Sequence, residues 1–168
     1  MLKITATVIG EEQLVRSLDR FTAGVSNLAP AFEEIGTDVR EILVEQFAQE
    51  GNGWAPLTPA YAIQKRKRYG DKPILRATDR MFESLTSMGA EGNVTEIAAM
   101  SAAYGTDVFY ARYHQTGTSR MAQRKIFALT EVNKRRIMRT LQRFLVTVGR
   151  DSGLQITGEQ GAFQQALT

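Results

Sequence analysis

The sequence predicts an α+β fold, in which a small antiparallel sheet packs with a long N-terminal helix and a C-terminal amphipathic helix. Two long segments, residues 27–49 and 130–148, repeat apolar residues at the 3.6-residue period of an α-helix. Short segments bounded by glycine and aspartate lie between them, which is typical of strands. After Gly149 the chain becomes rich in glycine and glutamine. We therefore expect one domain over residues 1–150, followed by an extended C-terminal tail over 151–168.

The N-terminal part of the chain predicts one strand and two helices. Residues 2–8 alternate apolar and polar side chains, which indicates a half-buried strand. A short helix is expected over 11–22, because its apolar residues share one helical face. The long helix over 27–49 tolerates Pro30 in its first turn, where the missing N–H costs nothing. Its apolar side is formed by Leu28, Phe32, Ile35, Val39, Ile42, Leu43 and Phe47.

The middle of the chain predicts short elements. Thr58 is expected to cap a helix that begins at Pro59 and carries the basic run of residues 65–68. The remaining expected elements are a short helix over 77–88 and strands over 94–100, 104–109 and 125–129.

The C-terminal helix is expected to bury a stripe made of Ile137, Leu141, Phe144, Leu145 and Val148. In the tail that follows, four of eighteen residues are glutamine and three are glycine, so the tail has little with which to form a core of its own. Its large apolar residues are Leu154, Ile156, Phe163 and Leu167. The first two alternate, and we expect the tail to dock on a neighbouring protein as an added edge strand.

Composition excludes several classes of function. The chain has no cysteine, which excludes disulfides, thiolate metal sites and cysteine nucleophiles. No apolar run approaches the ~18 residues that span a bilayer, and the first ten residues do not match a signal peptide. We therefore expect no membrane partner, and a protein that works in cytoplasm or in a particle assembled there.

Charge is unevenly distributed. Residues 1–50 hold nine acidic and four basic side chains, and residues 51–168 hold nine acidic and seventeen basic ones, giving net charges of −5 and +8. Each long helix carries a stripe of one sign: Glu34, Asp38, Glu41 and Glu45 on the first, and Arg135, Arg136, Arg139 and Arg143 on the last. One such stripe alone is usually a solvated face. Two stripes of opposite sign favour contact between identical subunits, and the asymmetry also suits a nucleic-acid face.

The run Lys65, Arg66, Lys67 and Arg68 has two interpretations of equal weight. It is either a solvated helix face or a contact with a partner or with DNA in a ring lumen. Few aromatic residues are interleaved with these basic residues, so we do not expect the protein to recognise a specific DNA sequence.

His114, the only histidine, decides whether an enzyme is expected. Hydrolysis would need a nucleophile and an orienting carboxylate, and Asp107 and Thr116 form no recognised arrangement with His114. No hydrolase, zinc-protease or phosphate-loop motif is present. We therefore expect His114, Gln115 and Gly117 to form a structural turn, and no catalysis, metal or cofactor.

Several segments together resemble the phage virion morphogenesis family, the tail-completion and neck proteins of tailed phages, including the Mu-type proteins. The segments are "FAQEGNGWAPLTPAYAIQKRKR", "ILRATDRMFESLT" and "YGTDVFYARYHQTGT". The residues that match the family pattern are Phe47, Trp54, Pro56, Leu57, Ile74, Leu75, Ser84, Leu85, Tyr110, Ala111, His114, Gln115 and Gly117. Two segments depart from it. The usual Thr-Gly-x-Leu is Thr78-Asp79-Arg80-Met81 here, and the usual Pro-x-Arg-Pro-Phe is replaced by "AQRKIF".

The resemblance implies a structural virion protein without catalysis. It would form a homo-oligomeric ring of six or twelve subunits at the head–tail junction, next to the portal or an adjacent neck or tail-terminator protein. It would contact passing genomic DNA non-specifically and would be found in the virion neck, and in host cytoplasm during assembly. The alternatives are a cytoplasmic DNA-binding accessory protein that uses its basic C-terminal half, and a small hydrolase built on His114.

Overall fold

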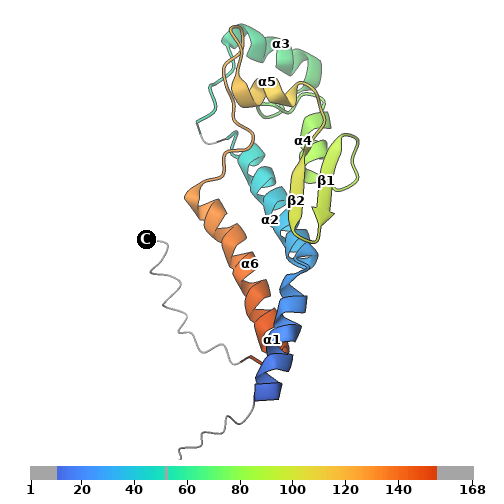
Figure 1. Ribbon diagram of the computed structural model, residues 1–168. Helices are drawn as coiled ribbons and strands as arrows, with labels where there is room; N and C mark the ends of the chain where they lie inside the picture. The colour runs from blue at the N-terminus through green and yellow to red at the C-terminus, as the bar shows by residue number, and fades with distance from the viewer. Residues whose placement is uncertain (1–10, 52, 155–168) are drawn as a thin grey trace, which may run out of the picture.

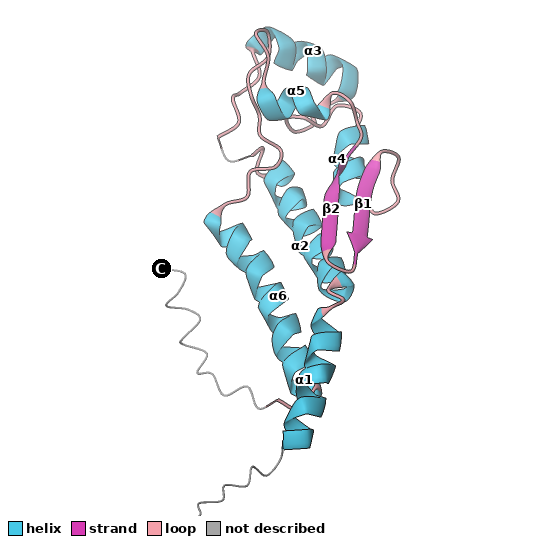
Figure 2. Ribbon diagram, viewed as in Figure 1, coloured by secondary structure: helices cyan, strands magenta, loops and turns pink. Residues whose placement is uncertain are grey.

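A computed structural model describes residues 11–51 and 53–154, and it confirms the predicted α+β fold (Figures 1 and 2). The helices are α1 (Glu11–Val25), α2 (Ala29–Ala48), α3 (Pro59–Tyr69), α4 (Arg80–Thr86), α5 (Ala111–Thr116) and α6 (Glu131–Asp151), and the strands are β1 (Asn93–Ala98) and β2 (Ser101–Thr106). The strand expected over residues 2–8 lies outside the described residues. No helix in the described ranges has the length and apolar character needed to cross a bilayer.

Helices α2 and α6 run side by side along the long axis of the molecule, and α1 packs on the lower part of α6 (Figure 1). A short break separates α1 from α2, because the backbone N–H of Leu28 donates to the carbonyl of Ala99 at the hairpin turn (2.7 Å). Pro30 lies in the first turn of α2, as predicted. The opposite end of the molecule is formed by α3, α5 and the loops that flank them (Figure 2).

The strands predicted over 94–100 and 104–109 correspond to a hairpin, but its second strand is β2 (Ser101–Thr106) and not residues 104–109. A tight connection between Ala98 and Ser101 has no glycine to mark it in the sequence. The hairpin packs on α2, where the Tyr104 hydroxyl donates to the carbonyl of Phe32. Gly36 makes this approach possible, since a Cβ there would lie 2.7 Å from the Tyr104 ring. The sheet is therefore fixed to the middle of α2.

The main core lies where the end of α2 meets α4, α5 and the loops between them. Phe47 is fully buried and makes edge-to-face contacts with Trp54 (5.5 Å between ring centroids) and Phe82 (5.3 Å). The other buried members of this cluster are Leu43, Ile74, Met81, Leu85, Val108, Ala111 and Ile126. Residues far apart in the chain therefore share a single core at this end of α2.

The prediction of a strand over residues 125–129 is wrong. This segment has no strand partner, because side chains satisfy its backbone groups. The Gln115 side chain accepts from the N–H groups of Ile126 (2.8 Å) and Phe127 (3.0 Å) and donates to the Phe127 carbonyl (3.1 Å). A glutamine thus takes the place of a neighbouring strand.

The buried stripe predicted for α6 is also wrong. Its five apolar residues are only half-buried, whereas Thr140 and Gly149 are the buried positions of the helix. Helix α6 faces α2 with a polar edge, on which the Thr140 hydroxyl donates to Asp38 (2.7 Å). The apolar stripe therefore lies beside this contact and not within it.

Replacing Phe47 with alanine should lower the free energy of unfolding by about 3–5 kcal/mol, because a fully buried ring that contacts two other rings is lost. Urea unfolding followed by circular dichroism measures this. The matched control is Val44→Ala on the same helix, where the side chain is 43% exposed and the change should stay within about 0.5 kcal/mol. Equal losses for the two variants would contradict the assigned core.

Candidate functional site

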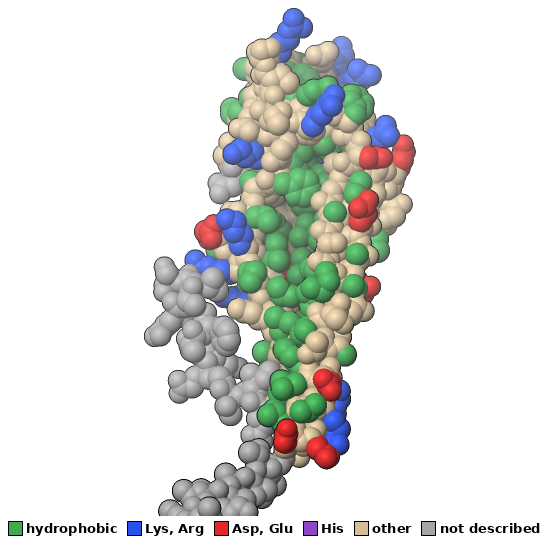
Figure 3. All heavy atoms as spheres, viewed as in Figure 1, with side chains coloured by type: hydrophobic (Ala, Val, Ile, Leu, Met, Phe, Trp, Pro, Cys, Tyr) green, Lys and Arg blue, Asp and Glu red, His purple; other side chains and the backbone are tan. Residues whose placement is uncertain are grey.

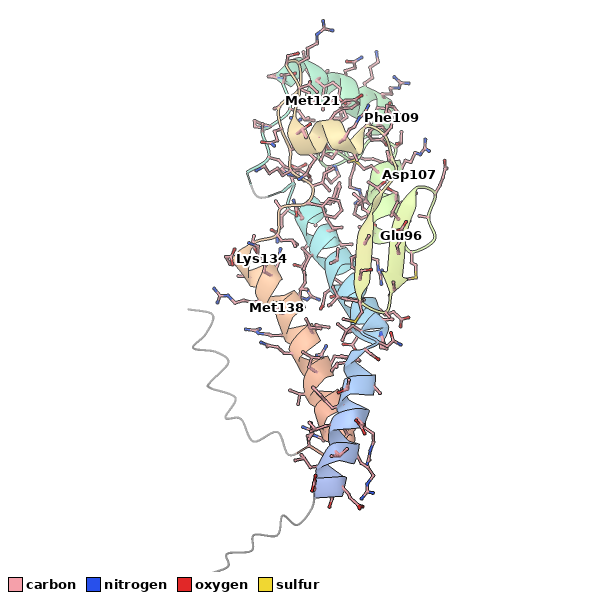
Figure 4. All side chains as sticks on the ribbon, viewed as in Figure 1. Glu96, Asp107, Phe109, Met121, Lys134 and Met138 are labelled. Atoms are coloured by element: carbon pink, nitrogen blue, oxygen red, sulfur yellow. The ribbon has the colours of Figure 1, made fainter. Side chains whose placement is uncertain are left out.

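Most residues that carry the sequence pattern gather at the α3–α5 end of the molecule. A cavity of about 720 Å³ lies there, between α3, the segment before α4, α5 and the loop over 120–124. Its apolar wall includes Leu57, Tyr61, Leu75, Met81, Tyr110 and Met121, and its polar groups are on Lys65, Asp79, His114, Arg120 and Arg124. Figure 4 shows Met121 at this end, above α5. The cavity is thus mainly apolar with a cationic side.

His114 lies on α5, and Gly117 ends this helix with a left-handed φ of 74°. His114 and Gln115 were expected in a turn, so the structure corrects their local conformation. The His114 ring packs edge-to-face on Tyr110 (6.2 Å), and its Nδ1 is buried without a hydrogen-bond partner in the described part of the chain. Burial, and then the charge of Arg124, lower the pKa of His114 below its ordinary value of 6.5. The imidazole is therefore neutral at pH 7.

The loop over 123–127 joins α5 to the end of α2. Arg124 donates from its backbone N–H to the His114 carbonyl (2.8 Å), and its guanidinium donates to the carbonyls of Ala55 (2.8 Å) and Pro56 (3.1 Å). The Lys125 carbonyl accepts from the Trp54 indole N–H (2.9 Å). Together with the Gln115 contacts, these bonds fix the loop, and we call residues 123–127 the clamp. The side chains of Trp54 and Gln115 therefore hold the clamp backbone, whereas His114 contributes its main-chain carbonyl and its ring lines the cavity.

Asp79 explains one departure from the family pattern. It occupies the glycine position of Thr-Gly-x-Leu and has a left-handed φ of 61°, a conformation that favours glycine and that aspartate tolerates. Its carboxylate accepts from Lys72 (2.6 Å) and Arg76 (2.7 Å). Burial acts to raise the pKa of Asp79, but these two hydrogen bonds outweigh it and the pKa is lowered. Ion pairs therefore hold the left-handed turn at Asp79, where the family pattern has glycine.

The basic run on α3 divides into one buried and three exposed residues. Lys65 is 5% exposed, and its ammonium donates to the carbonyls of Lys72 and Pro73 (2.7 Å to Pro73). Lys65 is therefore a structural residue and does not belong to a DNA-contacting surface. Arg66, Lys67 and Arg68 are exposed, and their contact with DNA or a partner stays a prediction.

The two charged stripes meet inside one chain. Arg136 pairs with Asp38 (2.8 Å), Glu41 and Glu45 (3.8 Å), and Arg143 pairs with Glu34 (3.0 Å). These acids raise the pKa of Arg136 further, chiefly through the hydrogen bonds that its guanidinium donates to Glu41 and Asp38. Arg135 and Arg139 are exposed and take part in none of these α2–α6 pairs. The sequence predicted the meeting of opposite stripes but placed it between subunits, and the role of these eight residues in a subunit interface stays a prediction.

The described residues do not form a catalytic or metal-binding arrangement. No hydrogen bond joins the His114 ring to a side chain in the ranges 11–51 and 53–154. No group of three histidine or acidic residues that could hold a metal ion occurs in those ranges either. Of the predicted tail contacts, Leu154 is half-buried, and Ile156, Phe163 and Leu167 lie outside the described residues.

Comparison with known proteins identifies the family. The model of the phage virion morphogenesis family matches residues 9–151, which include every element from α1 to α6. No curated protein and no solved structure matches the chain. The family predicted from the sequence is confirmed, and its Mu-type branch stays a prediction.

The lowered pKa of His114 predicts a pH dependence of stability. A group whose folded pKa is depressed takes up a proton more readily when unfolded, so its contribution is complete above the ordinary value of 6.5 and is lost as pH falls toward the folded value. The free energy of unfolding, measured with urea, should therefore fall more between about pH 8 and about pH 5 for the wild type than for His114→Gln. All other titrating groups are common to both proteins, so equal losses would exclude this role of His114.

The ion pairs between α2 and α6 predict an energetic coupling within the isolated subunit. A double-mutant cycle with Arg136→Ala and Asp38→Ala should give a coupling free energy of about 1 kcal/mol. The value is small because both side chains are partly exposed and solvent screens the pair. Arg135→Ala is the matched control and should change the free energy of unfolding by less than about 0.5 kcal/mol. A coupling that appears only at concentrations where the protein oligomerises would show that the pair acts between subunits.

Proposed function

We propose that this chain, which belongs to the phage virion morphogenesis family, forms a homo-oligomeric ring at the head–tail junction of a tailed phage. Membership in the family gives it a role in virion assembly. The ring position is the further step, and it joins the head to the tail through contacts with the portal or an adjacent neck protein. DNA passing through the ring would meet polar and basic side chains without being read in sequence.

The observation that carries this proposal is the opposite charge on the two long edges of the subunit. Glu96 on the hairpin and Asp107 after it are exposed on one edge, and Arg135 and Arg139 of α6 are exposed on the other. Figure 4 shows the labelled Glu96 and Asp107 on the hairpin side and Lys134 at the start of α6 on the other side. In Figure 3 most side chains along the α6 side are basic, and most along the hairpin side below α3 are acidic. A closed ring requires two unlike faces that meet head to tail. The two edges supply such faces.

The acidic stripe on α2 is not needed for this contact. Its carboxylates already have partners on α6, whereas the basic edge of Arg135 and Arg139 lies outside those pairs. We therefore place the hairpin edge of one subunit against the α6 edge of the next. Exposed pairs contribute only about 0–1 kcal/mol each, so the edges set register and direction more than affinity.

Charge reversal tests the ring contact. Glu96→Lys with Asp107→Lys should weaken the oligomer, because both edges are then basic, and Arg135→Glu with Arg139→Glu should weaken it as well. Combining all four changes should restore assembly, since opposite charges again face each other. Native mass spectrometry measures the subunit number, and electron microscopy of phage lysates counts heads that lack tails.

The matched control is Glu11→Lys with Glu12→Lys at the start of α1, a reversal of the same size away from both edges. An oligomer that forms equally well in every variant would reject the edge contact. Normal joined particles in the complete absence of the protein would reject the role at the head–tail junction.

A further inference from the structure

Helices α1 and α6 carry apolar side chains that their mutual packing leaves partly exposed. On α1, Leu14, Val15 and Leu18 are 54%, 50% and 46% exposed. On α6, Ile137, Leu141, Phe144, Leu145 and Val148 are only half-buried. Figure 3 shows apolar side chains in a column that runs down the molecule beside α6 and reaches α1 at its lower end. We call these eight residues the α1–α6 apolar face.

The exposure has a structural cause. Helix α1 packs on α6 through small residues, because Ser17 is buried and a Cβ on Gly24 would lie 2.3 Å from Val148. Leu14, Leu18 and Phe21 follow the i, i+4, i+7 spacing of one helical face, and this face lies beside the Ser17 edge. A contiguous apolar surface rimmed by charge usually marks an interaction site. The apolar residues of α1 are therefore left for a further contact.

The end of α6 forms a turn that lies against α1. Gly153 has a left-handed φ of 86°, its N–H donates to Arg150 (3.0 Å), and the Leu154 N–H donates to Gly149 (3.1 Å). These two bonds form a Schellman turn, which reverses the chain. A Cβ on Gly153 would lie 3.3 Å from the Ser17 hydroxyl, so the turn lies against α1.

The residues that follow the turn have the composition of a segment that binds an apolar surface. Residues 155–168 lie outside the described ranges, and their sequence holds Ile156, Phe163 and Leu167 with Glu159 as the one charged residue and no proline. Fully extended, fourteen residues span at most about 46 Å. The 21 residues of α6 are about 31 Å long, so the segment has more than the length of the face.

We infer that the α1–α6 apolar face of each subunit binds residues 155–168 of the adjacent copy of this chain. The inference rests on the proposed ring, in which α6 of one subunit lies against the next subunit. Each subunit then donates one segment and accepts another, which is the head-to-tail arrangement that closes a ring. Burial of Phe163 and Leu167 against α1 offsets the entropy lost when the segment is ordered.

The absence of cysteine from the chain permits a direct test. Leu18→Cys is placed on one full-length chain and Phe163→Cys on a second chain that carries a size tag, and the two are co-purified and oxidised. A disulfide between the chains should form at least about tenfold faster than with Asp19→Cys in place of Leu18→Cys, because docking raises the local thiol concentration. Asp19 is the matched control, since it is the next residue on α1, is exposed and lies outside the apolar face.

The outcomes separate this inference from the ring itself, whose subunit number is measured by native mass spectrometry before oxidation. A Leu18→Cys to Phe163→Cys cross-link between copies supports the inference even if no closed ring is found. A ring with no such cross-link overturns the inference and leaves the ring in place. A single chain that carries both Leu18→Cys and Phe163→Cys should also form disulfides between copies. A disulfide that forms only within one chain overturns the inference. Failure to oligomerise and to cross-link overturns both.

Discussion

The α3–α5 end of the molecule depends on a loop whose backbone is satisfied by side chains. The backbone of the clamp over residues 123–127 donates to the Gln115 side chain and accepts from the Trp54 indole. The Arg124 guanidinium donates to the carbonyls of Ala55 and Pro56. Buried backbone groups without partners are costly, so this loop can cross the core only if those side chains are present. Ile126 is thereby held against Phe47, Trp54 and α5 in one cluster. The pattern residues Trp54, His114 and Gln115 thus have a shared structural reason to occur together.

The other end of the molecule follows from the polar contact between α2 and α6. The Asp38 carboxylate accepts hydrogen bonds from both Arg136 and Thr140, and these contacts orient the polar edge of α6 toward α2. The apolar stripe of α6 must then face sideways, where α1 covers it only in part. Stabilisation within the subunit and exposure of an apolar surface are therefore two results of one helix orientation. In the proposed ring, that surface belongs to the subunit contact.

The sequence predicts the long helices well, because α2 and α6 carry strong periodicity and clear terminal signals such as Thr130, whose hydroxyl caps α6. It predicts a hairpin but not its register, since no glycine marks the turn before Ser101. It misses α5, a helix of six residues too short to show periodicity. The error at residues 125–129 has a different cause: β-type composition cannot reveal that Gln115 replaces a strand partner. Likewise, charge spacing predicts that opposite stripes attract, but only the antiparallel packing of α2 and α6 shows that they meet within one chain.

The small-residue contact between α1 and α6 has a consequence for the dynamics of the free subunit. Ser17 and Gly24 allow close approach but bury little apolar area, so α1 adds few of the contacts that resist local opening. Its amide hydrogens should exchange with solvent faster than those of α2, whose Ile42 and Phe47 lie in the protein interior. A contact on the outer side of α1, as in the proposed docking, would add to the stability of this helix. The stability of the subunit would then be linked to its incorporation.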